Sequence, residues 1–271
     1  AAPYSALTIV STAAWGLGYF GMPHILLRFM AIEDEKKLKL SRRVATIWVV
    51  ISLFVAVFIG VIGYTMSKVG ALEMLTGSNS ETIIVKISAL LSQHGVIFAL
   101  LAGVILAGIL ASTMSTSDSQ LLAASSAVSS DILGAFRKDS SNKNGSMAAA
   151  RITLLVISVV AAFIARNPDS SVFAIVSFAW AGFGAAFGPV VLFSLFWKRT
   201  NKWGALACMV CGGSMVFIWK YLIRPLGGIW NIYELLPAFL IACAAIVIVS
   251  LLTPKPSKEI EEEFDRVAQM K

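Results

Sequence analysis

Long, nearly uncharged apolar runs recur along most of this 271-residue chain and constrain its fold more than any other feature. The hydrocarbon core of a bilayer is about 30 Å thick, and an α-helix needs roughly 20 apolar residues to cross it. Runs of about that length lie at 5–30, 44–66, 95–122, 148–165, 170–197, 203–222 and 235–252. We therefore predict about seven transmembrane segments, forming a membrane domain over residues 1–252, followed by a tail over residues 253–271.

The fold class predicted for these segments is all-α. Backbone N–H and C=O groups find no water in hydrocarbon, so a spanning segment is either an α-helix or a strand of a closed barrel. The runs lack the period-two alternation of barrel strands. Only 14% of the residues are charged, against about a quarter in soluble domains, and the mean hydropathy is +0.81. The chain is thus expected to be a polytopic membrane protein.

Basic residues separate the connections between the runs into two sets. If the first run ends on the inside, seventeen Lys and Arg residues fall in the inside connections and tail, and five fall outside. Lys and Arg accumulate in cytoplasmic loops. We therefore predict a multi-pass protein of the cell membrane with a cytoplasmic C-terminus. The net charge of +7 then faces anionic membrane lipid, so it gives no reason to expect a nucleic acid partner.

The segment WGLGYFGMPH, Trp15 to His24, interrupts the first apolar run. Each of its three glycines weakens an α-helix by about 1 kcal/mol relative to Ala, and Pro23 removes a backbone donor. We predict a broken helix, whose dipole ends and unpaired backbone groups suit a zwitterionic solute. Trp15 and Tyr19, at i and i+4, would share one helix face and border that solute. A tightly packed glycine helix with interfacial aromatics accounts for the same residues about as well.

Hydroxyl side chains line one face of the third run. Ser112, Ser115, Thr116 and Ser119 repeat at i, i+3, i+4 and i+7, which is the spacing of one α-helical face. Sodium is a hard cation that prefers oxygen ligands, so this stripe is a candidate ion site. Asp118 is the one carboxylate well inside a predicted span, and an ionisable group at such a position is a functional candidate. Helix packing is the alternative reading of the stripe.

Other segments give structural predictions. Residues 83–91 carry apolar side chains at helical spacing, which predicts an amphipathic helix across the extracellular face, acting as a lid. The polar stretch at 138–146 predicts a loop, and the small residues of Ala179 to Pro189 predict close helix packing. The cysteines and histidines form neither a metal-ligand pattern nor a nucleophile with its base, so no enzyme activity is expected.

Three segments resemble those of the sodium:solute symporter family, and within it the branch that transports proline. They are WGLGYFGMPHILLRFM, ILASTMSTSDSQLLAASSAVSSDIL and FAWAGFGAAFGPVVLFSLFWKR, in the family's order and spacing. Arg199, Gly204 and Ala205 follow and resemble a later signature of the family. The resemblance implies the second half of an inverted-repeat, leucine-transporter-type symporter fold, whose first repeat is missing from this chain.

The resemblance also implies roles for particular residues. Ser115 and Thr116 would give hydroxyl ligands to sodium, and Ser112 a backbone carbonyl. Asp118 and Ser119 match positions that frame a second sodium in some members. The residues that would border the substrate are Trp15, Tyr19 and Pro23.

The function that the resemblance implies is sodium-coupled symport of a small amino acid, with L-proline favoured. Alone, this chain would lack half of the ion's ligands and the repeat against which it moves, so the missing N-terminal repeat is an expected partner. Symport of another small carboxylate or solute stays open, as does a cation channel. The aromatic-bordered break argues against a channel, because a channel binds no solute.

Overall fold

The structure, a computed structural model, describes residues 5–132, 143–166 and 171–269. In these residues it contains helices and turns and no strand, which confirms the all-α prediction. The chain divides into two compact units, one of residues 1–30 with 173–271 and the other of residues 31–172.

Six helices of the described residues are long and apolar enough to cross a membrane. They are Leu38–Lys68, Val96–Ser129, Met147–Ile164, Val172–Phe196, Lys202–Leu226 and Leu235–Leu252. Six of the seven predicted spans are thereby matched. The first predicted span, residues 5–30, is not a continuous helix, because it is divided near its middle.

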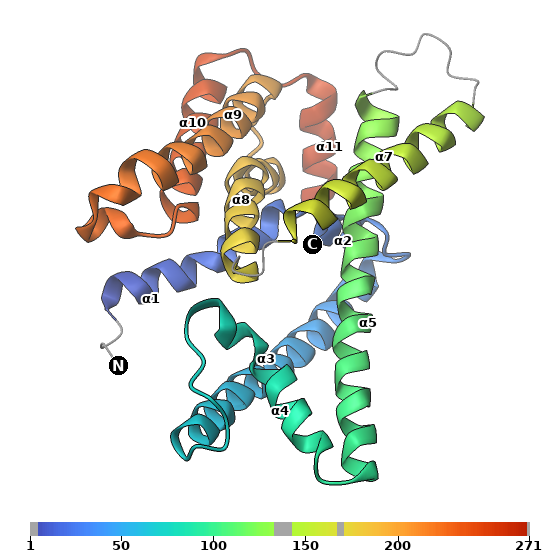
Figure 1. The fold of residues 1–271 in the computed structure, drawn as a ribbon. Helices are drawn as coiled ribbons and strands as arrows, with labels where there is room; N and C mark the ends of the chain where they lie inside the picture. Colours follow the sequence, from blue (N-terminus) through green and yellow to red (C-terminus); the bar gives the residue numbers. More distant parts are fainter. Residues whose placement is uncertain (1–4, 133–142, 167–170, 270–271) are drawn as a thin grey trace. The chain divides into compact units, whose positions relative to one another are not determined.

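The described residues of the unit 31–172 form four helices and short helical turns (Figure 1). They are η2 Glu35–Lys37, α3 Leu38–Lys68, η3 Gly77–Thr82, α4 Ile83–Ser92, α5 Val96–Ser126, η4 Ala127–Ile132 and α7 Lys143–Ile164. The predicted amphipathic helix is α4. It packs on α3 at Gly63. A Cβ at Gly63 would collide with Ile83, so the lack of a side chain there allows the contact. Gly95, with a φ of 112° that favours glycine, turns the chain from α4 into α5.

The loop predicted at 138–146 lies partly outside the described residues. Its last part is helical, because α7 begins at Lys143.

The unit of residues 1–30 and 173–271 holds the broken helix and four further helices. Its elements are α1 Ala6–Ala13, η1 Ala14–Gly21, α2 Pro23–Met30, α8 Val172–Phe196, α9 Lys202–Ile218, η5 Trp219–Ile223, η6 Arg224–Leu226, η7 Gly228–Asn231, α10 Leu235–Leu252 and α11 Lys258–Gln269. The tail after α10 therefore includes a helix. Most residues at the centre of the core come from η1, α8, α9 and α10, and they include Ala14, Trp180, Ala185, Val216 and Phe239.

Small residues let α9 and α10 pack closely (Figure 1). A Cβ on Gly204 would lie 3.0 Å from the carbonyl oxygen of Ile246, and one on Gly212 would lie 3.1 Å from the Cβ of Ala242. Close approach of helices through small residues is the usual packing mode in membranes, where apolar burial does not drive association.

Candidate functional site

The first predicted span is broken at Met22. Helix α1 ends at Ala13, a 3-10 helix continues from Ala14 to Gly21, and Met22 is extended with φ −83° and ψ 114°. The residue before a proline is disfavoured in the α region, which explains this conformation. Helix α2 then begins at Pro23, where the missing N–H costs nothing. The carbonyl of Met22 accepts bonds from Ile25 N and Leu26 N, both at 3.0 Å, and so starts α2.

The 3-10 geometry changes which residues share a face. With 3.0 residues per turn, Trp15, Gly18 and Gly21 lie in one row, whereas Tyr19 lies about 120° around the axis from Trp15. The expectation that Trp15 and Tyr19 share one face assumed an α-helix, whereas the structure has a 3-10 segment here, and both side chains meet the ring of Trp180. The row of Trp15 and the two glycines packs against α8.

The two glycines allow α8 to approach the backbone of the 3-10 segment. A Cβ added to Gly18 would collide with the indole of Trp180, and one on Gly21 would collide with the carbonyl of Phe183. On the α8 side, a Cβ on Gly184 would lie 2.7 Å from the Cα of Gly18. The small-residue stretch Ala179 to Pro189 thus serves helix packing, as predicted.

Trp180 joins the two aromatic residues that were predicted to border the substrate. Its Nε1 donates a hydrogen bond of 2.9 Å to the carbonyl of Trp15. Its ring stacks on Trp15 with centroids 5.6 Å apart, and Tyr19 meets it edge-on at 4.8 Å. Trp15 is half-buried, while 51% of Tyr19 is exposed. Tyr19 is therefore the more accessible of the two candidate substrate residues, and Pro23, the third, is half-buried at the start of α2.

Phe173 and Tyr233 complete the aromatic group around Trp15. Their ring centroids lie 5.3 Å and 5.9 Å from that of Trp15, with nearly parallel planes. Sequence reasoning missed Trp180 and Tyr233. The position of Trp180 inside the small-residue stretch could have indicated its role, because a large ring among small residues needs space on a neighbouring segment. Tyr233 gave no comparable signal.

The candidate sodium residues lie on α5, which is continuous from Val96 to Ser126, so the hydroxyl stripe does share one helix face. Thr116 Oγ1 donates to the carbonyl of Ser112 at 3.2 Å, and Ser119 Oγ donates to the carbonyl of Ser115 at 3.0 Å. These bonds use the hydroxyl hydrogens and leave oxygen lone pairs for a cation. Asp118 is exposed and lies on the same helix. Its role and the ligand roles of the stripe stay predictions.

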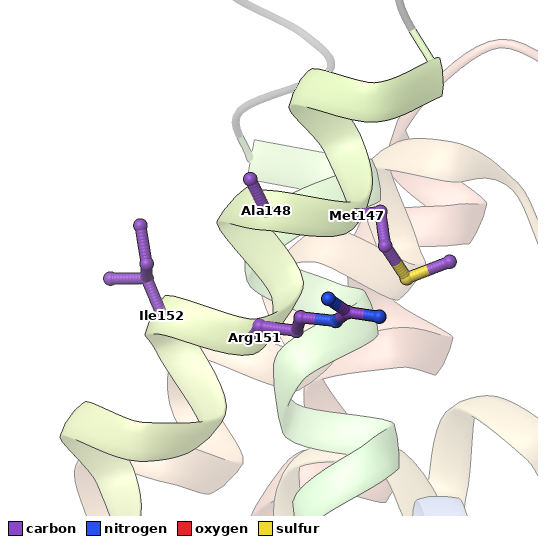
Figure 2. A pocket seen from close by; sticks show the side chains of 4 residues that line it. All are labelled: Met147, Ala148, Arg151 and Ile152. Carbon is purple, nitrogen blue, oxygen red and sulfur yellow. The ribbon is translucent and has the colours of Figure 1, made fainter.

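The stripe and the broken helix belong to different units, so the structure describes each half of the predicted site separately. Two open surface hollows in the described part of the chain contain none of the predicted site residues. One follows the first turns of α7, holds about 500 Å³ and is lined by Met147, Ala148, Arg151 and Ile152 (Figure 2). The other is an apolar hollow of about 540 Å³ between α8 and α10.

The class of protein follows from these features. Membrane-length helices, one broken segment with a proline-started half-helix, and a hydroxyl-lined helix face are the parts from which secondary transporters build their sites. The model of the sodium:solute symporter family matches residues 3–212. The chain belongs to the sodium:solute symporter family, which is a family of transporters.

Several curated proteins are similar to this chain over nearly all of its length. The sodium/proline symporter of Haemophilus influenzae is 41% identical over 262 residues, which is 96% of this chain and 51% of that protein. The osmoregulated proline transporter OpuE of Bacillus subtilis is 39% identical over 94% of this chain and 50% of that protein. The sodium/proline symporter of Escherichia coli is 38% identical over 95% and 50%. The chain thus spans about half the length of these relatives, and no solved structure matches it.

Proposed function

We propose that this chain is the C-terminal half of a sodium-coupled symporter that carries L-proline into the cell. The observation that carries the proposal is the break at Met22, which places the start of α2 and the end of a 3-10 segment within one membrane-length stretch. The half-helix N-terminus suits a carboxylate, and backbone carbonyls suit an ammonium group. Relatives at about 40% identity that are named sodium/proline symporters support proline as the solute.

In this proposal Trp15, Tyr19 and Pro23 border the solute. Sodium binds the Ser115 and Thr116 hydroxyls and the Ser112 carbonyl, with Asp118 and Ser119 framing a second sodium. The remaining ligands come from the N-terminal repeat, which would be the partner of this half. The intrahelical bonds of Thr116 and Ser119 use the hydroxyl hydrogens, so the hydroxyl oxygens keep lone pairs that can bind a cation.

Coupling between solute and ion follows from linkage. If both ligands favour the same arrangement of the broken helix and α5, each raises the affinity for the other by the same factor. Binding from outside and release to the cytoplasm then need only two arrangements of the repeats. The protein would lie in the cell membrane with the tail of residues 253–271 in the cytoplasm, as the distribution of Lys and Arg indicates.

The test is uptake of radiolabelled proline into proteoliposomes that contain the complete gene product, with an inward sodium gradient or with potassium in its place. Sodium-dependent uptake is the expected result. Sodium-dependent uptake of a different carboxylate would keep symport and change the solute. Sodium flux that needs no solute would mean a cation channel and would overturn the proposal.

A further inference from the structure

Tyr233 connects the segment before α10 to the broken helix. It is 9% exposed, and its backbone N donates to Ser11 Oγ of α1 at 3.1 Å. Its phenol donates to the carbonyl of Ser177 on α8 at 2.6 Å, and its ring stacks on Trp15 with an interplanar angle of 16°. One side chain and its backbone therefore contact α1, η1 and α8 together.

An ion pair fixes the backbone next to Tyr233. Glu234 is 2% exposed, and its carboxylate accepts a 2.8 Å bond from Nη1 of Arg224. Arg224 also donates through Nε to Asn231 Oδ1 at 3.0 Å. A buried carboxylate is costly unless it is paired and hydrogen-bonded, so the pair strongly favours one position of this segment.

The phenol of Tyr233 remains a hydrogen-bond donor over a wide pH range. Its burial, and secondly the neighbouring Glu234 carboxylate, raise the pKa of Tyr233 above its ordinary value. The phenol is therefore protonated near neutral pH and can donate its bond to Ser177.

The segment that carries Trp15 has little to hold it rigid on its own. Three of the eight residues of η1 are glycines, and 3-10 bonds have poorer geometry than α-helical ones. Contacts with other elements must therefore fix the Trp15 ring, and the stacked rings of Trp180 and Tyr233 are among those contacts.

We propose that Tyr233, held in place by the Arg224–Glu234 pair, is a positioning residue that fixes Trp15 in the solute site. The inference rests on the proposed function, because Trp15 is a substrate residue only in that proposal. Tyr233 acts through Trp15 and need not touch the solute.

The test uses the full-length transporter in proteoliposomes and measures KM for proline separately from the maximal rate. Tyr233→Leu removes the stack and the phenol, so KM should rise about fivefold to tenfold with the maximal rate per folded protein little changed. Tyr233→Phe keeps the stack and should raise KM about twofold. Phe54→Leu, which breaks the stacked pair with Phe58 on α3, is the matched control and should leave KM unchanged. A lower maximal rate with unchanged KM for Tyr233→Leu would show a merely structural role and overturn the proposal.

Two further comparisons test the route of the effect. The KM increases of Trp15→Leu and Tyr233→Leu should not multiply in the double variant, because both act through the same ring. The double variant Arg224→Gln/Glu234→Gln should raise KM and should add nothing to Tyr233→Leu. Multiplicative effects in either case would overturn the proposed route.

Near-ultraviolet circular dichroism of the purified proteins separates this inference from the transport function. Tyr233→Leu should change the tryptophan bands and Phe54→Leu should not, whether or not the protein takes up proline. If Tyr233→Leu changes the tryptophan bands but the wild-type protein shows no sodium-dependent uptake, the proposed function is refuted and the contact between Tyr233 and Trp15 is retained. Unchanged tryptophan bands in Tyr233→Leu would refute the positioning role.

Discussion

The indole Nε1 of Trp180 donates a 2.9 Å hydrogen bond to the backbone carbonyl of Trp15, 165 residues earlier in the chain. The bond is possible because Gly18 has no side chain, so the indole lies directly against the 3-10 segment. The contact between α8 and the broken helix therefore depends on the absence of a side chain at Gly18.

Replacing Gly18 by alanine should destabilise the protein. The added methyl group meets the Trp180 indole, and the resulting overpacking should lower the free energy of unfolding by about 1–3 kcal/mol. Gly16→Ala in the same 3-10 segment is the control, because the Cβ it would add meets no atom of another element within 4 Å. Denaturant titration in detergent micelles measures both. Equal effects of the two substitutions would show that the Trp180 contact does not explain Gly18.

Removing the Thr116 hydroxyl should weaken sodium binding. The loss of one ligand to a charged ion, about 1.5–3 kcal/mol, should raise the sodium concentration for half-maximal proline uptake at least about tenfold. Ser115→Ala should act in the same direction. Thr113→Ala is the control, because Thr113 makes the same kind of intrahelical bond, to Ile109 O at 2.9 Å, but lies off the stripe. Unchanged half-saturation by sodium in Thr116→Ala would refute the ligand assignment.

The loop between α3 and α4 should lose protection in acid. A hydrogen bond from Lys86 at 2.7 Å, and next its charge, lower the pKa of Glu73 below the ordinary value of 4.5. Glu73 thus binds a proton more readily in the unfolded chain than in the folded one. The stabilisation by the Glu73–Lys86 pair is therefore complete above pH 4.5 and is lost as the pH falls through the lowered pKa. Hydrogen exchange around Glu73, corrected for its intrinsic pH dependence, should show this change. In Lys86→Met the same pH window should have no such effect, and an unaltered acid response there would contradict the assignment.

The contact of α11 with the end of α8 should be sensitive to salt. Lys198 lies 2.6 Å from the carboxylate of Asp265 and 4.0 Å from that of Glu261, and the hydrogen bond to Asp265 is the main cause that raises the pKa of Lys198. Exposed pairs are screened at high ionic strength, so added salt and Lys198→Gln should both speed hydrogen exchange in α11. Arg266→Gln is the control, because its partner Glu263 lies within α11 itself. If neither added salt nor Lys198→Gln changes the rate of hydrogen exchange in α11, apolar contacts hold this helix in place.

Local sequence patterns predicted the helices and the place of the break well. The amphipathic pattern at 83–91 became α4, and Pro23 with its neighbouring glycines marked the break, because both effects act within a few residues. Helix limits were less accurate. Helix α3 begins at Leu38 rather than near residue 44, since Lys39, Arg42 and Arg43 can extend from its first turns into water.

The order of residues is enough to show that this chain crosses a membrane several times as helices, since hydrocarbon accepts no unpaired backbone and only the apolar runs are long enough to span it. The face shared by Ser112, Ser115 and Thr116 likewise follows from helical periodicity alone. The position of Trp15 in a 3-10 segment among Trp180 and Tyr233, and the burial of Glu234 against Arg224, became known from the folded structure. Trp180 and Tyr233 lie far from Trp15 along the chain, and the Glu234 pair depends on the burial of one loop, so their energies come from packing that no local pattern encodes.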